Sequence, residues 1–380
     1  MNILHLFSNY KWTGPAEPAV NLAAALQNRG HRVCFASGRR PGRADSKCVH
    51  EYAAGRGLDV INKMRLAKHV HIAGDLADAR VLSGIISENE IDVIHTHLGN
   101  DHLIAALAAR RMAVPPKIIR TFYDGSRLPW RIRTIYLLSR HTDRAIFCSG
   151  AVRDATVARY LFDESRTAVL EGAVDVERFD PDRSLPDVRS RLGFSPEDYV
   201  VGIVARVQWH RRFGVLLDAA EKAAASLPDF RLLVIGRGTN LEAIAARPVL
   251  ERGLQGVVKF AGYLEADDYV GCLAALDAKV FLVPGSDGSC RAVREAMAMG
   301  VPAIVADCGM LPEIVEDGVT GRVIAADAAR GLAEAFIELS NTARRNAMAL
   351  AAGERARRDF DVRRLAENVE AVYREVLDAE

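Results

Sequence analysis

The segment VVGIVARVQWHRRFGVLLDAAEKAAASLPDFRLLVIGRG, residues 200–238, decides the fold class of this 380-residue chain. An apolar run over 200–206 predicts a strand, an alanine- and leucine-rich stretch over 216–225 predicts a helix, and 231–238 predicts a second strand. Strands that are joined through a helix pair in parallel, because the crossover returns the chain to the same end of the sheet. The segment therefore predicts an α/β fold with a doubly wound sheet.

The same alternation of strands and helices runs through most of the chain. It weakens over 176–197, where three prolines and many charges predict a domain boundary. We expect two Rossmann-like domains that face a central cleft, residues 1–180 and 181–360, with a helix at about 360–380 that packs back on the first. The other predicted strands are 2–7, 31–37, 92–97, 117–122, 144–149 and 166–174 in the first domain, and 257–264, 278–283 and 302–307 in the second.

The composition is typical of a globular protein, with 49% hydrophobic and 26% charged residues. No run approaches the roughly 20 apolar residues of a membrane span, and the apolar start is too short for a signal peptide. The six cysteines are scattered without a C-x-x-C pair, so neither a zinc site nor a disulfide framework is predicted. These features predict a cytoplasmic protein with reduced thiols.

The net charge of +1 hides an asymmetry between the two halves. Residues 1–175 carry 24 Lys and Arg against 17 Asp and Glu, whereas residues 176–380 carry 26 against 32. The stretch RLPWRIRTIYLLSR, residues 127–140, mixes arginines with Trp, Ile, Leu and Tyr. This composition suits a segment that binds an anionic membrane surface. A solvated basic face, or a helix that packs its apolar side inward, would have the same composition. We expect no nucleic-acid partner.

The stretch GSDGSCRAVREAMAMGVP, residues 285–302, places two acids eight positions apart. Ser289 is predicted to cap a helix over about 290–299, and the amides at such a helix start attract a phosphate. Asp287 and Glu295 would then lie roughly 10 Å apart. This spacing suits a ligand with a charged middle and hydroxyl groups at both ends, such as a nucleoside-diphosphate sugar. The alternative is a loop acid followed by a surface acid on an amphipathic helix.

The D-x7-E pattern, followed by AMAMGVPAIVADCGMLPEIVEDGVTGRVI, resembles the E-x7-E region of the retaining glycosyltransferases of family 4, which have the GT-B fold. VLEGAVDVERFDP resembles the linker of that family, and TGPAEPAVNLAAALQNRGHRV resembles its N-terminal glycine loop and helix. The resemblance covers about residues 2–325. It implies transfer of a hexose-type sugar from a nucleotide-sugar donor to an acceptor, with no metal and no other cofactor.

The resemblance implies roles for individual residues. Arg206 and Arg211 match the positions that hold the donor pyrophosphate, and Glu295 matches the acid on the ribose hydroxyls. Asp287 takes the place of the first glutamate, which is expected on the transferred sugar. The other candidate donor-binding residues are Gly14, Gly236, Gly262, Tyr263, Gly288, Ser289, Cys290 and Arg291.

Several positions depart from the family pattern. Pro15 stands where a second glycine is usual, and Tyr123 stands where many relatives carry a histidine. His97 is a further catalytic candidate, whereas His95 is expected to be a core histidine that is bonded to the backbone. The two histidines share a strand face, but metal binding is not expected because no third ligand is spaced nearby. With Asp287, these departures leave a nucleotide-sugar binding protein without transferase activity as an alternative.

The chemistry of the leaving group supports the arginine assignment independently of the resemblance. Departure of a nucleoside diphosphate builds negative charge, which two arginines beside a helix start would stabilise in the transition state. The basic N-terminal half favours an envelope glycan or lipid-linked acceptor at the inner face of the cytoplasmic membrane. A small soluble acceptor, such as a sugar phosphate or inositol, is the alternative.

Overall fold

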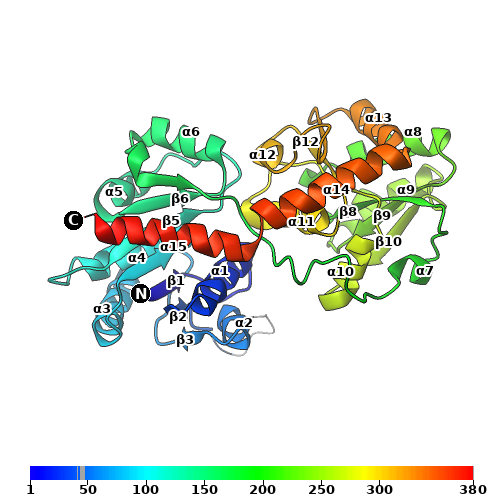
Figure 1. Ribbon diagram of the computed structural model, residues 1–380. Coiled ribbons are helices and arrows are strands. Elements are labelled where there is room, and N and C mark those ends of the chain that lie inside the picture. Colours follow the sequence, from blue (N-terminus) through cyan, green and yellow to red (C-terminus); the bar gives the residue numbers. More distant parts are fainter. Residues whose placement is uncertain (41, 43–47, 380) are drawn as a thin grey trace. The chain divides into compact units, whose positions relative to one another are not determined.

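The computed structural model describes residues 1–40, 42 and 48–379, and their contacts divide the chain into two compact units (Figure 1). Val174 already belongs to the second unit, where its N–H donates to the carbonyl oxygen of Phe360 at 2.8 Å, so the division lies earlier than residue 180. The first unit consists of Met1–Ala173, Ser286–Ser289 and the segment from Val362 onward, and the second of Val174–Gly285 and Cys290–Asp361.

The first unit is built on a seven-stranded sheet in which every strand pair is parallel. The order β3-β2-β1-β4-β5-β6-β7 reverses between β1 and β4, which is where doubly wound sheets bind ligands. The strands are β1 (Asn2–Phe7), β2 (Arg32–Ser37), β3 (Asp59–Ile61), β4 (Val93–Thr96), β5 (Lys117–Phe122), β6 (Arg144–Phe147) and β7 (Thr167–Val169).

Helices bury both faces of this sheet, as the alternation within β1 shows. Ile3 and Phe7 belong to a core with α1 and α15, whereas Leu4 and Leu6 belong to a core with α3 and α4. Helix α15, red in Figure 1, packs against α1. The helices are α1 (Ala16–Asn28), α2 (Val49–Gly55), α3 (Ile72–Glu88), α4 (Gly99–Ala109), α5 (Ile132–His141), α6 (Gly150–Tyr160) and α15 (Val362–Asp378).

The second unit repeats the same topology in a six-stranded parallel sheet of order β10-β9-β8-β11-β12-β13. The strands are β8 (Tyr199–Val204), β9 (Phe230–Ile235), β10 (Val258–Gly262), β11 (Ala278–Phe281), β12 (Ala303–Ala306) and β13 (Gly321–Ile324). The helices are α7 (Val188–Arg191), α8 (Phe213–Ser226), α9 (Arg247–Glu251), α10 (Ala266–Ala274), α11 (Asp287–Ala298), α12 (Leu311–Ile314), α13 (Ala329–Ser340) and α14 (Thr342–Asp359).

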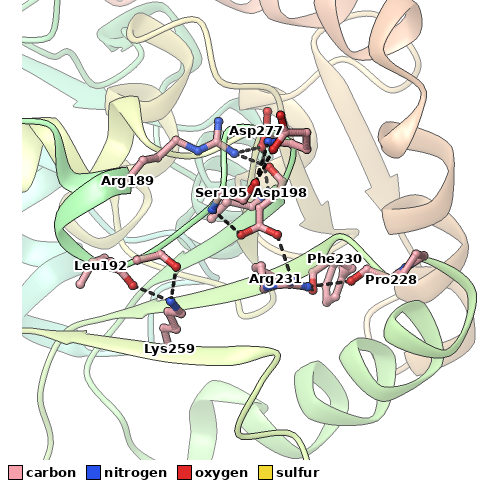
Figure 2. Close-up of polar contacts among 12 residues, drawn as sticks. Arg189, Leu192, Ser195, Asp198, Pro228, Phe230, Arg231, Lys259 and Asp277 are labelled. Carbon is pink, nitrogen blue, oxygen red and sulfur yellow. Dashed lines mark hydrogen bonds and ion pairs between the residues drawn. The ribbon is translucent and has the colours of Figure 1, made fainter.

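Charged groups tie the segment before β8 to the amino edge of the second sheet (Figure 2). Asp198 pairs with Arg231 at 3.0 Å, and Asp277 pairs with Arg189 at 3.1 Å. Lys259 donates to two carbonyl oxygens just after α7, at 2.5 and 2.8 Å. The charges at this edge therefore have structural partners, which leaves the carboxyl edge as the place for ligand chemistry.

The α/β class and the two doubly wound sheets agree with the sequence prediction, but two edge strands were missed. β3 has three residues and β13 has four, and each lies at the edge of its sheet with one paired neighbour. The six cysteines all lie within the described residues and form no disulfide. Among the described residues, no helix has the length and apolar character that crossing a membrane requires.

Candidate functional site

Glycines at the carboxyl edge of the second sheet fix the turn that carries Arg206. Gly236 has a φ of +141°, and a Cβ there would lie 2.1 Å from the carbonyl oxygen of Ala205. A Cβ at Gly238 would lie 2.2 Å from the carbonyl oxygen of Val207. Only glycine leaves room for such close backbone approaches, so the two glycines hold the residues on either side of Arg206.

Arg206 and Arg211 form a cationic pair after β8. Arg206 is exposed, whereas Arg211 is half-buried at the end of the 3-10 turn η2 (Trp209–Arg211), 5.9 Å from the ring centroid of Phe281. Burial lowers the pKa of Arg211, and the nearby charge of Arg206 adds to this effect. In the described part of the chain neither arginine forms an ion pair, and the buried Nε of Arg211 has no hydrogen-bond partner. Two cations without a counter-ion make this edge attractive to an anion.

The turn after β10 lies at the same edge of the sheet as this pair of arginines, with β9 between β10 and β8. Gly262 has a φ of +73° and accepts a hydrogen bond from the N–H of Gly236 at 2.7 Å. Tyr263 is 53% exposed, its hydroxyl donates to Glu265 at 2.8 Å, and the Arg237 guanidinium lies 4.3 Å from its ring centroid. This stacked, exposed surface suits a flat aromatic ligand group.

Helix α11 begins earlier than predicted and corrects two expectations. Asp287 lies in its first turn, not in a loop ahead of it. Ser289 is therefore not the N-cap: it lies inside the helix, where its hydroxyl donates to the carbonyl oxygen of Ser286 at 2.9 Å. Asp287 and Cys290 are both buried. Burial of Asp287 also contradicts the alternative that it is a plain loop acid.

The first turn of α11 groups with the first unit. The N–H of Asp287 donates to the carbonyl oxygen of Tyr123 at 2.8 Å. A Cβ at Gly288 would lie 2.5 Å from the carbonyl oxygen of Gly14, so this position requires glycine. Pro15 is the N-cap of α1 and carries no N–H, which leaves Gly14 as the amide donor of this loop.

Glu295 is held inside the second unit and is only 2% exposed, so it is not the surface acid of the alternative reading. Its carboxylate accepts from the hydroxyl of Tyr269 at 2.5 Å and pairs with Nε of Arg291 at 2.9 Å. Arg291 therefore turns toward this acid. Lys279 on β11 is fully buried nearby; burial lowers its pKa to about 7, against the opposing effect of Glu295. Lys279 was not predicted as a site residue, although a lysine within an apolar strand was a visible signal.

Three buried histidines stack on one face of the first sheet. His5 on β1 lies directly opposite His95 on β4 in the strand register. Neighbouring ring centroids are 5.1 Å (His5 to His95), 5.2 Å (His5 to His97) and 4.6 Å (His95 to His97) apart. Burial lowers the pKa of His5 to about 3 and that of His97 well below its usual value, so these imidazoles are neutral. His5 was missed because it lies within an apolar strand pattern.

The histidine stack is arranged for hydrogen bonding, although its ligand nitrogens lie within 4.8 Å of one another. The ring planes are nearly parallel, with interplanar angles of 11°, 17° and 27°. Nδ1 of His95 is 2.5 Å from Tyr373 Oη, and its Nε2 is 2.6 Å from Thr121 Oγ1. The expectation of a backbone partner for His95 was therefore wrong.

Tyr123 ends the stack at the carboxyl edge, immediately after β5. Nε2 of His97 is 3.0 Å from Nδ1 of His5, and its Nδ1 is 2.7 Å from the hydroxyl of Tyr123. Burial raises the pKa of Tyr123 well above 10, so the phenol stays protonated. When protons are donated from His5 to His97 and from His97 to Tyr123, the phenol proton is left for a ligand oxygen. The arrangement suits hydrogen-bond donation better than proton abstraction.

A cavity of about 320 Å³ adjoins Tyr123 and His97 in the first unit. Its wall includes Arg120 from β5 and two arginines near the start of α5, Arg131 and Arg133. Arg120 was not predicted as a site residue, because the strand pattern KIIRTF gave no sign that its arginine faces a cavity.

The structure of the basic stretch over 127–140, most of which forms α5, shows how its apolar side chains are placed. Leu137 and Leu138 are buried, as in a helix that packs inward. Trp130, Ile132 and Tyr136 are nevertheless 53%, 70% and 46% exposed. The helix therefore packs on one side and leaves aromatic and aliphatic groups among arginines on the other.

Comparison with known proteins finds family models that match segments of both units. A family model described as glycosyl transferases group 1 matches residues 186–359, and one described as glycosyltransferase family 4 matches residues 14–178. The D-inositol 3-phosphate glycosyltransferase of Mycobacterium sp. (strain KMS) is 31% identical over 253 residues, which is 61% of this chain. The chain spans only 55% of that relative.

A second relative and one solved structure agree with these matches. The lipopolysaccharide core biosynthesis mannosyltransferase LpsB of Rhizobium meliloti (strain 1021) is 30% identical over 248 residues, which cover 63% of this chain and 68% of LpsB. The crystal structure of Anabaena HepE in complex with UDP matches with a TM-score of 0.82 at 20% identity, covering 99% of this chain and 100% of HepE. At that identity the structural match shows the fold.

Proposed function

The chain belongs to glycosyltransferase family 4, with the GT-B fold, and on that premise we propose that it moves a hexose-type sugar from a nucleoside-diphosphate sugar to an acceptor hydroxyl with retention of configuration. Its relatives are named for transfer to inositol 3-phosphate and for a mannosyl transfer in lipopolysaccharide core synthesis. The observation that carries the proposal is the cationic pair Arg206 and Arg211, which has no carboxylate partner in the described residues.

The donor would bind along the carboxyl edge of the second sheet. The pyrophosphate is assigned to Arg206 and Arg211, because guanidinium groups bind phosphate oxygens through paired N–H donors. The ribose hydroxyls are assigned to Glu295, which would exchange its hydrogen bond from Tyr269 for one from the ligand. The remaining donor candidates are Gly14, Gly236, Gly262, Tyr263, Asp287, Gly288, Ser289, Cys290 and Arg291, with the base on the side of Tyr263 and the sugar on the side of Asp287.

The proposed reaction is a front-face displacement. The bond between the anomeric carbon and the phosphate oxygen breaks, and the acceptor oxygen bonds to the same face of that carbon. The acceptor proton passes to the departing phosphate oxygen, so no protein base is needed. Arg206 and Arg211 stabilise the charge that builds on the diphosphate, and this proposal requires no metal or cofactor. Tyr123, positioned by His97, would donate a hydrogen bond to a sugar or acceptor oxygen.

We place the acceptor among envelope glycan or lipid-linked precursors, at the inner face of the cytoplasmic membrane. The support is the segment around α5, where Trp130 before the helix and Ile132 and Tyr136 within it are exposed, with several arginines close by in the sequence. Such a surface binds anionic lipid through apolar contact and charge together. Retention on anionic vesicles at low salt, and its loss in Ile132→Ser, would support this assignment. Failure of anionic vesicles to retain the protein would remove it.

Donor binding and product analysis test the central proposal. Calorimetry with UDP, GDP and ADP is expected to show binding of one nucleotide that Arg211→Met weakens strongly. Incubation of the matching nucleotide sugars with a panel of glycan and lipid-linked acceptors is expected to give a product whose anomeric configuration, measured by NMR, equals that of the donor. Absence of nucleotide binding would refute the proposal. Binding without turnover across the panel would favour a nucleotide-sugar binding protein.

A further inference from the structure

The cavity of about 320 Å³ in the first unit is lined by a buried cation with two nitrogens that lack a hydrogen-bond partner among the described residues. Arg120 is 7% exposed and lines this cavity. Its Nε and Nη1 are buried without a hydrogen-bond partner among the described residues. A buried guanidinium with unsatisfied N–H groups is costly, because neither water nor protein replaces the lost hydration. A cation in this state next to a cavity indicates a missing anion.

The nearest acid does not fill this role. Asp101 is fully buried, and its carboxylate lies 4.0 Å from Nη1 of Arg120, at the outer limit of an ion pair. Its oxygens already accept from the backbone N–H groups of Ser8 at 3.0 Å and of Leu98 at 2.9 Å. Asp101 therefore serves mainly to fix the start of α4, and it supplies no hydrogen bond to Arg120.

The wall of the cavity carries a net positive charge. Arg131 and Arg133 also line it, and in the described part of the chain neither makes an ion pair. Burial lowers the pKa of Arg120, the charges of Asp101 and Asp124 oppose this effect, and the charge of Arg133 adds a smaller lowering effect. Among the described lining residues, Asp124 is the only acid.

The aromatic and neutral groups of the wall suit a polar ligand with one charged end. The guanidinium of Arg120 lies 4.8 Å from the ring centroid of Phe122, which holds it in place from one side. Tyr123 and His97 at the same wall are uncharged hydrogen-bonding groups. The volume is at the lower end of that of small-molecule sites, roughly 300 to 1,000 Å³.

We propose that this cavity binds the anionic group of the acceptor, a phosphate or phosphodiester, with Arg120 as its buried anchor and Arg131 and Arg133 as its rim. That the bound group belongs to an acceptor rests on the proposed transfer reaction. The anion site itself does not depend on that reaction. The anionic group would satisfy the free N–H groups of Arg120 and would place an adjoining hydroxyl near Tyr123. Either a free phosphorylated polyol or a phospholipid headgroup offers this chemistry.

Phosphate binding to the full chain tests the site. The double variant Arg206→Met, Arg211→Met removes the cations of the second unit, so that phosphate bound in this background reports on the first. We expect methyl phosphate to bind it with an affinity on the order of millimolar by calorimetry. Adding Arg120→Met is expected to weaken binding about tenfold or more, and Arg120→Lys to weaken it less. Arg111→Met, at an exposed arginine on the same unit, is the matched control and is expected to change nothing.

The outcomes separate this inference from the proposed function. Equal methyl phosphate affinity with and without Arg120→Met, or no binding in the double variant, would overturn the anion site. Should Arg120→Met fail to fold, as judged by circular dichroism, Arg133→Met provides the same test at a less buried position. Nucleotide binding is measured separately on the Arg120→Met single variant, where we expect it to be unchanged. Absence of nucleotide binding in the unaltered chain would refute the proposed transferase function. It would not affect the conclusion drawn from methyl phosphate binding.

Vesicles distinguish the two sources of the phosphate. Retention on phosphatidylglycerol vesicles but not on phosphatidylcholine vesicles, reduced by Arg120→Met and not by Arg111→Met, would identify a lipid headgroup. Equal retention of both variants, together with the loss of methyl phosphate binding in Arg120→Met, would identify a free phosphorylated acceptor. Each result supports an anionic acceptor, and only the calorimetric outcomes above decide against it.

Discussion

The two sheets share a strand order but carry different chemistry where that order reverses. In the first sheet, β1 and β4 present neutral imidazoles that are stacked, buried and hydrogen-bonded as far as Tyr123. In the second, the strand β8, which is equivalent to β1, leads to an exposed and a half-buried cation, Arg206 and Arg211, beside glycine turns. The topology therefore sets where a ligand meets each sheet, and the side chains set whether it meets hydrogen bonds or charge.

The contrast assigns different tasks to the two edges. A diphosphate leaving group gains charge in the transition state, so it needs fixed cations. A hydroxyl group or a sugar oxygen needs orientation, which a neutral hydrogen-bond chain provides without a strong electrostatic field. Arg120 is aligned with Thr96 and not with a histidine in the strand register, although it lines the same cavity as His97 and Tyr123.

The largest effect is expected from removing a cation at the edge of the second sheet. Arg206→Ala removes one of two cations from the proposed pyrophosphate position and is expected to lower turnover by about 100-fold or more, the scale of one preorganised contact to developing charge. Steady-state kinetics with the identified nucleotide sugar measure it. Arg247→Ala, at an exposed arginine on α9, is the control. A loss below about threefold in Arg206→Ala would place the diphosphate elsewhere.

Glu295→Gln tests whether the second unit recognises the donor through an acid as well as through cations. The substitution keeps the shape and one acceptor oxygen but removes the charge that accepts from Tyr269 and Arg291. A hydrogen bond to a charged group contributes about 1.5–3 kcal/mol, so nucleotide affinity is expected to fall by roughly 10- to 100-fold. Calorimetry with the bound nucleotide measures this change, and Glu251→Gln on α9 is the control. Unchanged affinity would show that the ribose does not reach Glu295.

Much of the fold was predictable because its determinants are local. The apolar strands and the helix pattern of 200–238 specify a parallel unit, and the two doubly wound sheets followed from repeating that pattern. The edge strands β3 and β13 were not predicted, since they are established by pairing with one neighbouring strand at the edge of each sheet. The start of α11 was misplaced because Gly288 and Ser289 read as a loop, whereas the structure places both inside the helix.

The side chains of the candidate site were only partly predictable, for a different reason. Arg206, Arg211, Asp287 and Glu295 could be named because they lie in segments that resemble a family. His5, Arg120 and Lys279 gain their meaning from burial and from partners on other strands, which no local pattern displays. His5 matters through its register with His95, a pairing between residues 90 positions apart in the chain.

Lys279 is a buried amine in the second unit, and its low pKa makes the stability of the chain depend on pH. Its pKa is about 7 in the folded chain, against 10.5 for an ordinary lysine, owing to burial and, to a lesser extent, to Arg211, with Glu295 opposing. Between these values the unfolded chain binds more protons, so the unfolding free energy of the protein rises with pH in that window. Below pH 7 both states are protonated, and the cost of the buried charge is greatest.

Lys279→Met is therefore expected to raise the unfolding free energy at pH 6, an advantage that shrinks by up to about 3 kcal/mol toward pH 9, because about two units of the pKa shift lie in that range at about 1.4 kcal/mol each. Urea unfolding at pH 6, 7.5 and 9 measures the trend. Lys222→Met, at an exposed position on α8, should show no pH-dependent difference from the unaltered chain. A difference for Lys279→Met that does not vary with pH would show that the amine does not titrate in this range.

The smallest effect is expected from removing a hydroxyl at the end of the neutral hydrogen-bond chain in the first unit. Tyr123→Phe keeps the ring but removes the hydroxyl that lies 2.7 Å from His97. One neutral hydrogen bond contributes about 0.5–1.5 kcal/mol, so turnover is expected to fall only about 2- to 10-fold. Because burial lowers the pKa of His97 well below its usual value, the pH–rate profile of the unaltered enzyme should show no step near 6.5 that this variant removes. Tyr199→Phe, in the core of the second unit, is the control for loss of a buried hydroxyl. A fall beyond about 100-fold, with a changed pH profile, would mean that the first sheet transfers a proton and that its edge is as reactive as the charged one.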